Sequence, residues 1–182
     1  MTKRMRERVE KLKKITGGSN VSGWMFDNVA MFVYGMVKLY QPDLVIQTGH
    51  LWGKSAVVVL EALTDGGAIE GEDPDGDLAF REFVRGRRRV SVSPRLVSID
   101  PYTPGVPRWK EGIAYLTDTY GDAFQFVQEP SSKFFERPLD ACSWARRVMG
   151  IVDGDHSQQG VRGDLEGLSK LGIGLIIVDD TG

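Results

Sequence analysis

Short apolar runs recur along this chain, and most of them end at a glycine or an acidic residue. They cover residues 44–46, 95–100, 124–127, 150–156 and 173–180. Apolar residues at helical spacing lie before and between them, most clearly over 21–40 before the first run and over 55–63 after it. Short apolar runs that alternate with amphipathic segments are typical of strands connected by helices. The pattern predicts an α/β fold with a mainly parallel sheet and helices on both faces.

The stretch from Asp43 to Ala62 reads as a strand, a glycine turn and a helix. Gly49 and Gly53 interrupt the apolar run, and we expect Ser55 to cap the helix that follows. A helix N-terminus placed above a strand end can bind an anionic or polar ligand. The alternative is that the glycines only make the bend that any α/β protein needs. The spacing is not the Gly-x-Gly-x-x-Gly pattern of dinucleotide sites, so a nicotinamide cofactor is disfavoured.

Acidic residues follow three of the later predicted strands. Asp100 ends the second strand, where a carboxylate either accepts hydrogen bonds from a ribose or starts a turn before proline. The fourth and fifth strands are followed by Asp153, Asp155 and His156, and by Asp179 and Asp180. In a parallel sheet all of these emerge at the carboxyl edge, where open α/β sheets hold their ligands. This is the strongest chemical cluster in the sequence.

The order of these segments resembles that of class I S-adenosylmethionine-dependent methyltransferases, which have a Rossmann-like fold. The resemblance rests on Gly49-x3-Gly53-Lys-Ser55, on Val97-Ser-Ile-Asp100, on Asp153-Gly-Asp-His156-Ser-x4-Arg162-x-Asp164, and on Leu175-Ile-Ile-Val-Asp-Asp180. It is closest to the branch of cephalosporin-hydroxylase-like proteins and small-molecule O-methyltransferases. The resemblance implies that the protein binds S-adenosylmethionine and methylates a hydroxyl of a small molecule.

The resemblance also assigns roles to single residues. Gly49, Gly53 and Ser55 would lie against the methionine part of the cofactor, Asp100 at its ribose and Ser131 near its adenine, with Asp153 also at the cofactor. Asp153, Asp179 and Asp180 match the positions that hold a divalent ion such as Mg²⁺ in the metal-dependent members. His156 matches the general base, and an unperturbed histidine titrates near neutral pH.

The chain departs from the family pattern in three places. Gln47 replaces the usual acid before the first glycine, and Glu129-Pro130 replaces the Gly-Asp pair expected before Ser131. The chain also stops at Gly182, after the fifth strand, where the family continues with a helix and two further strands. We therefore expect a reduced form whose fifth-strand edge is covered by a homo-oligomer, or a fragment or degenerate relative. A non-catalytic binding or assembly protein on the same fold is the main alternative function.

Composition and charge limit where the protein can act and which partners it can bind. The 182 residues carry a formal charge of −2 and one cysteine, which excludes an internal disulfide. No membrane span or signal peptide is predicted, so we expect a cytoplasmic protein. Arginines 85–89 are the only support for a nucleic-acid substrate, and their acidic neighbours argue against one. We divide the chain into a basic helix or tail over 1–18, interpreted as solvated, and a methyltransferase-like domain over 19–182 with a charged excursion at 64–93.

Overall fold

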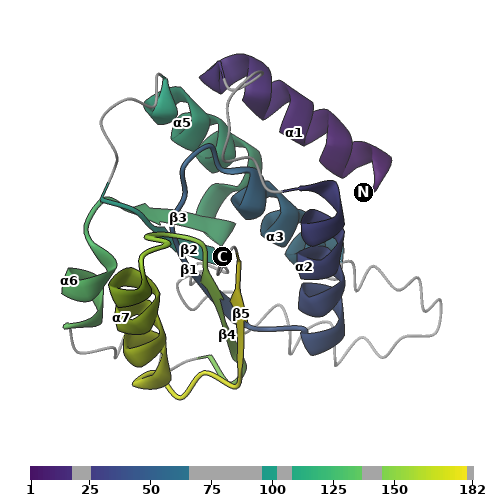
Figure 1. Ribbon diagram of the computed structural model, residues 1–182. Helices are drawn as coiled ribbons and strands as arrows, with labels where there is room; N and C mark the ends of the chain where they lie inside the picture. The colour runs from purple at the N-terminus through teal and green to yellow at the C-terminus, as the bar shows by residue number, and fades with distance from the viewer. Residues whose placement is uncertain (18–25, 66–95, 102–107, 137–144, 180–182) are drawn as a thin grey trace, which may run out of the picture.

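A computed structural model describes residues 1–17, 26–65, 96–101, 108–136 and 145–179 of the chain (Figure 1). Its helices are α1 (Lys3–Thr16), α2 (Asp27–Tyr40), α3 (Lys54–Asp65), α5 (Trp109–Tyr120), α6 (Ser131–Phe135) and α7 (Gln158–Ser169), with a 3₁₀ turn at Gly121–Ala123. Its strands are β1 (Leu44–Thr48), β2 (Leu96–Ile99), β3 (Phe124–Val127), β4 (Val148–Val152) and β5 (Leu175–Val178). All five strands were predicted from the sequence, with shifts of a few residues at their ends.

The five strands form one sheet in the order β3-β2-β1-β4-β5, and every neighbouring pair is parallel. The predicted Rossmann-like α/β fold is therefore confirmed. The chain moves outward from β1 to β2 and β3, and then returns to the other side of β1 for β4 and β5. This reversal places a topological switch point between β1 and β4, which is where open parallel sheets bind ligands.

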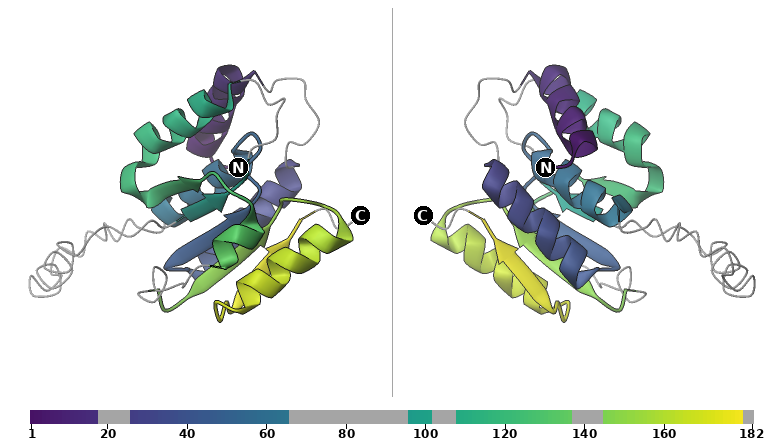
Figure 2. Two further views of the ribbon diagram at one scale, coloured as in Figure 1. Left: turned by 90° about the vertical axis from the view of Figure 1, so that its left-hand side faces the viewer. Right: turned by 90° about the vertical axis from the view of Figure 1, so that its right-hand side faces the viewer.

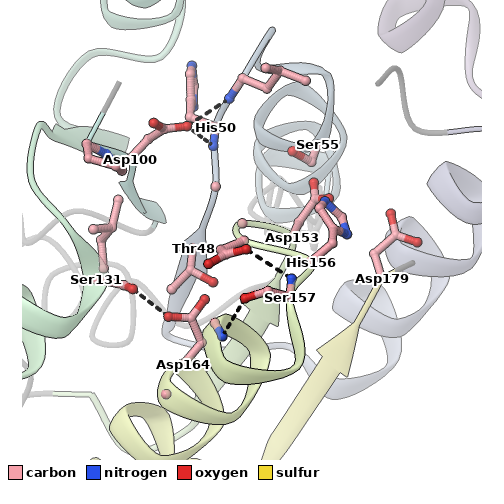
Figure 3. Close-up of a pocket in the computed structure, with 18 of the residues that line it drawn as sticks. Thr48, His50, Ser55, Asp100, Ser131, Asp153, His156, Ser157, Asp164 and Asp179 are labelled. Carbon is pink, nitrogen blue, oxygen red and sulfur yellow. Dashed lines mark hydrogen bonds between the residues drawn. The ribbon is translucent and has the colours of Figure 1, made fainter. Parts of the chain in front are cut away.

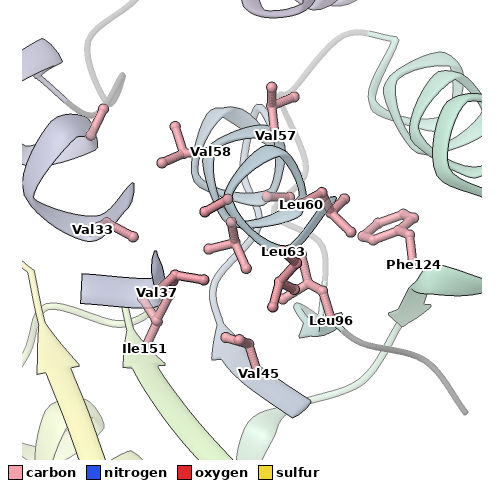
Figure 4. Packing of buried hydrophobic residues seen from close by; sticks show 14 of the residues in the cluster. Val33, Val37, Val45, Val57, Val58, Leu60, Leu63, Leu96, Phe124 and Ile151 are labelled. Carbon is pink, nitrogen blue, oxygen red and sulfur yellow. The ribbon is translucent and has the colours of Figure 1, made fainter. Parts of the chain in front are cut away.

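Helices cover both faces of the sheet (Figure 2). On one face α2, α3 and α5 pack on alternate strand residues such as Val45, Leu96 and Ile151 (Figure 4). On the other face α6 and α7 pack on the intervening residues, including Ile46 and Val97. All five residues of β1 are buried, as expected for the central strand of a parallel sheet.

The basic N-terminal segment is a helix with a buried face. Met5, Val9 and Leu12 of α1 are at most 1% exposed, and α1 packs outside α3 and α5 (Figure 1). Most of its basic residues are exposed, as the interpretation as a solvated helix requires, but Arg4 and Arg8 reach the buried Glu61 of α3. The weak apolar spacing in the sequence hid the stripe, because Met5 and Thr16 contribute to it as well.

Two further helices differ from the sequence-based expectation. The helix predicted from Val21 begins only at Asp27, because Phe26 before it is extended, with φ −62° and ψ 150°; residues 18–25 lie outside the described part of the chain. Its apolar residues are only partly core: Val33 and Val37 are buried, whereas Phe32 is 57% and Leu39 81% exposed. The helix α5 was not predicted, because glycine, threonines and charged residues interrupt its apolar pattern.

The charged excursion predicted at 64–93 falls almost wholly outside the described residues, and so does Asp180. In the part of the chain that the structure describes, no helix has the length and apolar character needed to cross a bilayer.

Candidate functional site

The register of the parallel strands places the predicted site residues side by side at the carboxyl edge of the sheet. Thr48 pairs with Ile99 and with Val152, and Val152 pairs with Val178. The next residues along the four strands are Gly49, Asp100, Asp153 and Asp179, which therefore emerge side by side at the carboxyl edge. They line a cleft of about 1900 Å³ (Figure 3). Every other described candidate lines it as well, namely Gly53, Ser55, Ser131 and His156.

The glycine turn is locked to the end of β2 by Asp100. Its Oδ2 accepts hydrogen bonds from the backbone N–H groups of His50 (2.8 Å) and Leu51 (3.1 Å). Gly49 has a φ of +82°, and a Cβ on it would lie 2.0 Å from the carbonyl oxygen of Asp153. Glycine is thus required at position 49 by both the backbone angle and the close approach of the β4 end.

Gln47 takes the place of an acid and ties the same turn to the helix behind it. Its Nε2 donates to the carbonyl of Gly49 and to Oγ of Ser55 at 2.7 Å, and its side chain is fully buried. A carboxylate could not donate these bonds. The prediction that Ser55 is the N-cap of α3 was wrong. The helix begins at Lys54, so Ser55 lies inside its first turn.

His50 anchors the turn in the core below the cleft. It is 6% exposed, its Nδ1 lies 2.9 Å from Oγ of Ser98, and its ring packs against Phe124 and Phe126. Burial lowers the pKa of His50 to about 4, and the negative charge of Asp100 offsets only part of this effect. His50 is therefore neutral at physiological pH.

Ser131 begins α6 and donates a hydrogen bond to Oδ1 of Asp164 on α7 (Figure 3). Asp164 is 4% exposed and also lines the cleft. The bond fixes the start of α6 relative to α7, and so sets where Ser131 can meet a ligand. Sequence reasoning gave Asp164 no role, although it belongs to the motif that follows β4.

His156 stands in the exposed loop that leads into α7. Ser157 is the N-cap of α7 and accepts from the N–H of Gly160 at 3.0 Å, while Asp155 accepts from the N–H of Ser157 at 2.9 Å. That backbone hydrogen bond holds the pKa of Asp155 below its usual value. Ser157 and Asp155 therefore cap the start of α7. His156 is not needed for this role, and it is exposed and lines the cleft.

The predicted metal ligands can be followed only in part. Asp153 and Asp179 follow the paired strands β4 and β5, and carboxylate oxygens suit a hard ion such as Mg²⁺. Asp180, the third predicted ligand, lies outside the described residues. Within the described ranges, no three His, Cys, Asp or Glu side chains are grouped closely enough to hold a metal ion. The donor chemistry fits, and the metal site stays a prediction.

One ion pair in the cleft was missed from the sequence. Nζ of Lys54, at the start of α3, lies 2.9 Å from Oδ1 of Asp27, at the start of α2, and both residues line the cleft. Nothing in the sequence connects two residues that are so far apart along the chain. The only signal was the place of Lys54 inside the glycine turn motif.

Comparisons with known proteins find structural similarity but no match in sequence. No family model matches the sequence, and no curated protein does. Among solved structures, the chain is similar to the crystal structure of SAH-bound Podospora anserina methyltransferase PaMTH1, with a TM-score of 0.61 over 98% of this chain. The identity is 14%, and the chain spans 62% of the length of that structure. The chain therefore has a fold similar to that of a methyltransferase, which agrees with the resemblance seen in its sequence motifs.

Proposed function

We propose that this protein transfers a methyl group from S-adenosylmethionine to a hydroxyl of a small molecule, assisted by a divalent ion such as Mg²⁺. One observation carries the proposal: at the switch point of the sheet, the Asp100 carboxylate and the Gly49–Gly53 turn interlock at the wall of a large cleft. The similarity in fold to a methyltransferase crystallised with SAH supports the choice of cofactor.

The cofactor would lie across the carboxyl ends of β1, β2 and β4. Gly49, Gly53 and Ser55 would contact its methionine part, Asp100 would accept hydrogen bonds from its ribose hydroxyls, and Ser131 would lie near its adenine. Asp153 would line the methionine side. Ligand pockets commonly have volumes of about 300–1000 Å³, so the cleft of about 1900 Å³ has room for an acceptor beside the cofactor.

In the proposed reaction, the chain itself supplies the general base that removes a proton from the acceptor hydroxyl. His156 would accept the proton of the acceptor hydroxyl, whose oxygen then bonds to the methyl carbon as the carbon–sulfur bond breaks. The products are a methyl ether and S-adenosylhomocysteine. A Mg²⁺ ion held by Asp153, Asp179 and Asp180 would lower the pKa of the bound hydroxyl. The remaining contribution is positioning of the two reactants.

Isothermal calorimetry with S-adenosylhomocysteine, with and without Mg²⁺, tests the proposal. We expect micromolar binding that Asp100→Ala weakens at least about tenfold, because hydrogen bonds to a charged group contribute about 1.5–3 kcal/mol each. The matched control is Asp118→Ala, on the exposed face of α5. No heat from a folded protein would contradict the proposal. Binding without turnover of any hydroxylated acceptor would favour the alternative, a non-catalytic binding protein.

Asp180→Asn tests the metal separately, because Asp180 is proposed as a metal ligand alone, whereas Asp153 would also line the methionine side. We expect it to remove the stimulation of methyl transfer by Mg²⁺ while leaving the affinity for S-adenosylhomocysteine largely unchanged. Equal activity of this variant and the parent protein without added metal would contradict a metal-assisted mechanism.

A further inference from the structure

Lys54 is a buried cation in the wall of the cleft. Its side chain is 7% exposed, whereas that of its partner Asp27 is 73% exposed. The hydrogen bond from Lys54 lowers the pKa of Asp27, so the carboxylate is charged at neutral pH. The pair therefore places one positive and one negative group 2.9 Å apart in the wall of the cleft.

Stability does not account well for this arrangement. Lys54 is the first residue of α3, where the positive end of the helix dipole disfavours a cation. Burying an ammonium group costs free energy, and the Asp27 carboxylate that pairs with it is largely in water. Ligand sites commonly include a charged residue among a few placed polar groups.

The surroundings are arranged for a polar ligand. Next to Lys54 are the Gly53 turn and the first turn of α3, whose N–H groups have no carbonyl partner within the helix. Elsewhere in the wall of the same cleft, Oγ1 of Thr48 is buried with no hydrogen-bond partner among the described residues. Asp27 provides a carboxylate beside Lys54 in the wall of the cleft.

We propose that Lys54 and Asp27 together bind the amino-acid end of the cofactor. Lys54 and the first turn of α3 would hold its carboxylate, and Asp27 would hold its ammonium group. An α-amino acid is a zwitterion, and the pair offers the complementary charges on adjacent groups. The inference rests on the proposed function, and it names two specificity-determining residues that the sequence motifs did not indicate.

Two ligands separate this role from a general effect on binding. S-Adenosylhomocysteine carries the amino-acid end, and 5′-methylthioadenosine has the same nucleoside and sulfur without it. In calorimetry, Lys54→Met should weaken S-adenosylhomocysteine binding at least about tenfold and change methylthioadenosine binding by less than about twofold. Asp27→Asn should act in the same direction, and because Asp27 is exposed this variant is expected to fold normally.

Lys13→Met is the matched control. Lys13 makes an ion pair of the same length, 2.9 Å to Glu10, on α1 and outside the cleft. It should change the affinity for neither ligand. The inference is overturned if the Lys54 and Asp27 variants weaken both ligands equally, or neither, while the parent protein binds S-adenosylhomocysteine. If the parent protein binds neither ligand, the proposed function itself fails, and the inference with it.

Discussion

At the scale of single residues, Gly49 is the position where the site tolerates least change. A Cβ there would collide with backbone atoms of Asp153 and Gly154, which cannot move without shifting the end of β4. We expect Gly49→Ala to lower the free energy of unfolding by at least about 2 kcal/mol. It should also abolish binding of S-adenosylhomocysteine, as measured by calorimetry and urea unfolding.

Gly35→Ala is the control for this substitution. Gly35 lies in α2 with nothing within 4 Å of an added Cβ. Because alanine favours helices, we expect this variant to gain about 0.5–1 kcal/mol of stability and to bind the ligand normally. A Gly49 variant that behaved like the Gly35 variant would show that the close approach of β1 and β4 is not required.

His50 should make stability depend on pH. Its pKa is about 4 in the folded protein and about 6.5 when unfolded, so the unfolded chain binds more protons between these values. The contribution of neutral His50 is complete above pH 6.5 and is lost as the pH falls toward 4. The difference of about 2.5 pKa units corresponds to about 3 kcal/mol.

Urea unfolding of the parent protein and of His50→Gln at pH 7, 6 and 5 measures this effect. We expect the loss of stability between pH 7 and 5 to be smaller in the variant, whatever its absolute stability. His156→Gln, which changes the only other histidine of the chain, should keep the pH dependence of the parent. Parallel pH profiles for all three proteins would mean that His50 does not titrate in this range.

At the scale of elements, α1 is fastened to the core by a buried acid. Glu61 of α3 is fully buried, and its Oε1 accepts hydrogen bonds from Arg8 and, at 2.8 Å, from Tyr120 of α5. Arg4 Nε lies 3.1 Å from Oε2, and the guanidinium of Arg8 stacks 4.7 Å over the Tyr120 ring. Two basic residues of α1, Arg4 and Arg8, therefore face the buried carboxylate of α3.

Arg8→Ala should be strongly destabilising, because it leaves the Glu61 carboxylate buried with a weaker counter-charge. We expect a loss of about 2 kcal/mol or more in thermal or urea unfolding. Arg162→Ala breaks an ion pair to Glu166 whose two side chains are 80% and 60% exposed, and it should leave the unfolding midpoint unchanged. Equal effects of the two variants would show that α1 is not held through Glu61.

The elements that the sequence predicted well are those whose pattern is local. Each strand is a short apolar run with a glycine or acid behind it, and the parallel order followed from the alternation with helices. The buried face of α1 was missed because its partners, α3 and α5, are distant in the chain. In the same way, α5 has only Gly112, Leu116 and Tyr120 buried, too few apolar residues to stand out before the fold is known.

At the scale of the whole molecule, the same distinction explains the site. Residues that directly follow strands could be placed from the sequence, because a parallel sheet brings its carboxyl ends together. Contacts between helices could not: the pair of Lys54 with Asp27 and the bond of Ser131 to Asp164 depend on how α2, α6 and α7 pack. Both contacts belong to the packing of helices on the sheet, for which the strand pattern contains no information.

The edge of the sheet at β5 bears on the assembly of the molecule. Among the described strands, β5 pairs with β4 alone, and an apolar edge strand invites further pairing. The end of α2 lies beside the start of β5, since a Cβ at Gly174 would be 2.5 Å from the Tyr40 hydroxyl. Leu39, the residue before Tyr40, is 81% exposed. That another copy of the chain covers this edge stays a prediction, and it requires light scattering to give a multiple of the chain mass of 20.2 kDa.

Proline substitutions in β5 can separate pairing between copies from pairing within the sheet. The N–H of Asp179 donates to Val152 of β4, so the alternation along a strand points the N–H of Ile177 inward as well and that of Val178 outward. Val178→Pro should keep the fold by circular dichroism and shift the mass to that of one chain. Ile177→Pro removes a bond to β4 and should unfold the protein. A parent protein that is monomeric, or a Val178→Pro variant that stays dimeric, would contradict pairing through this edge.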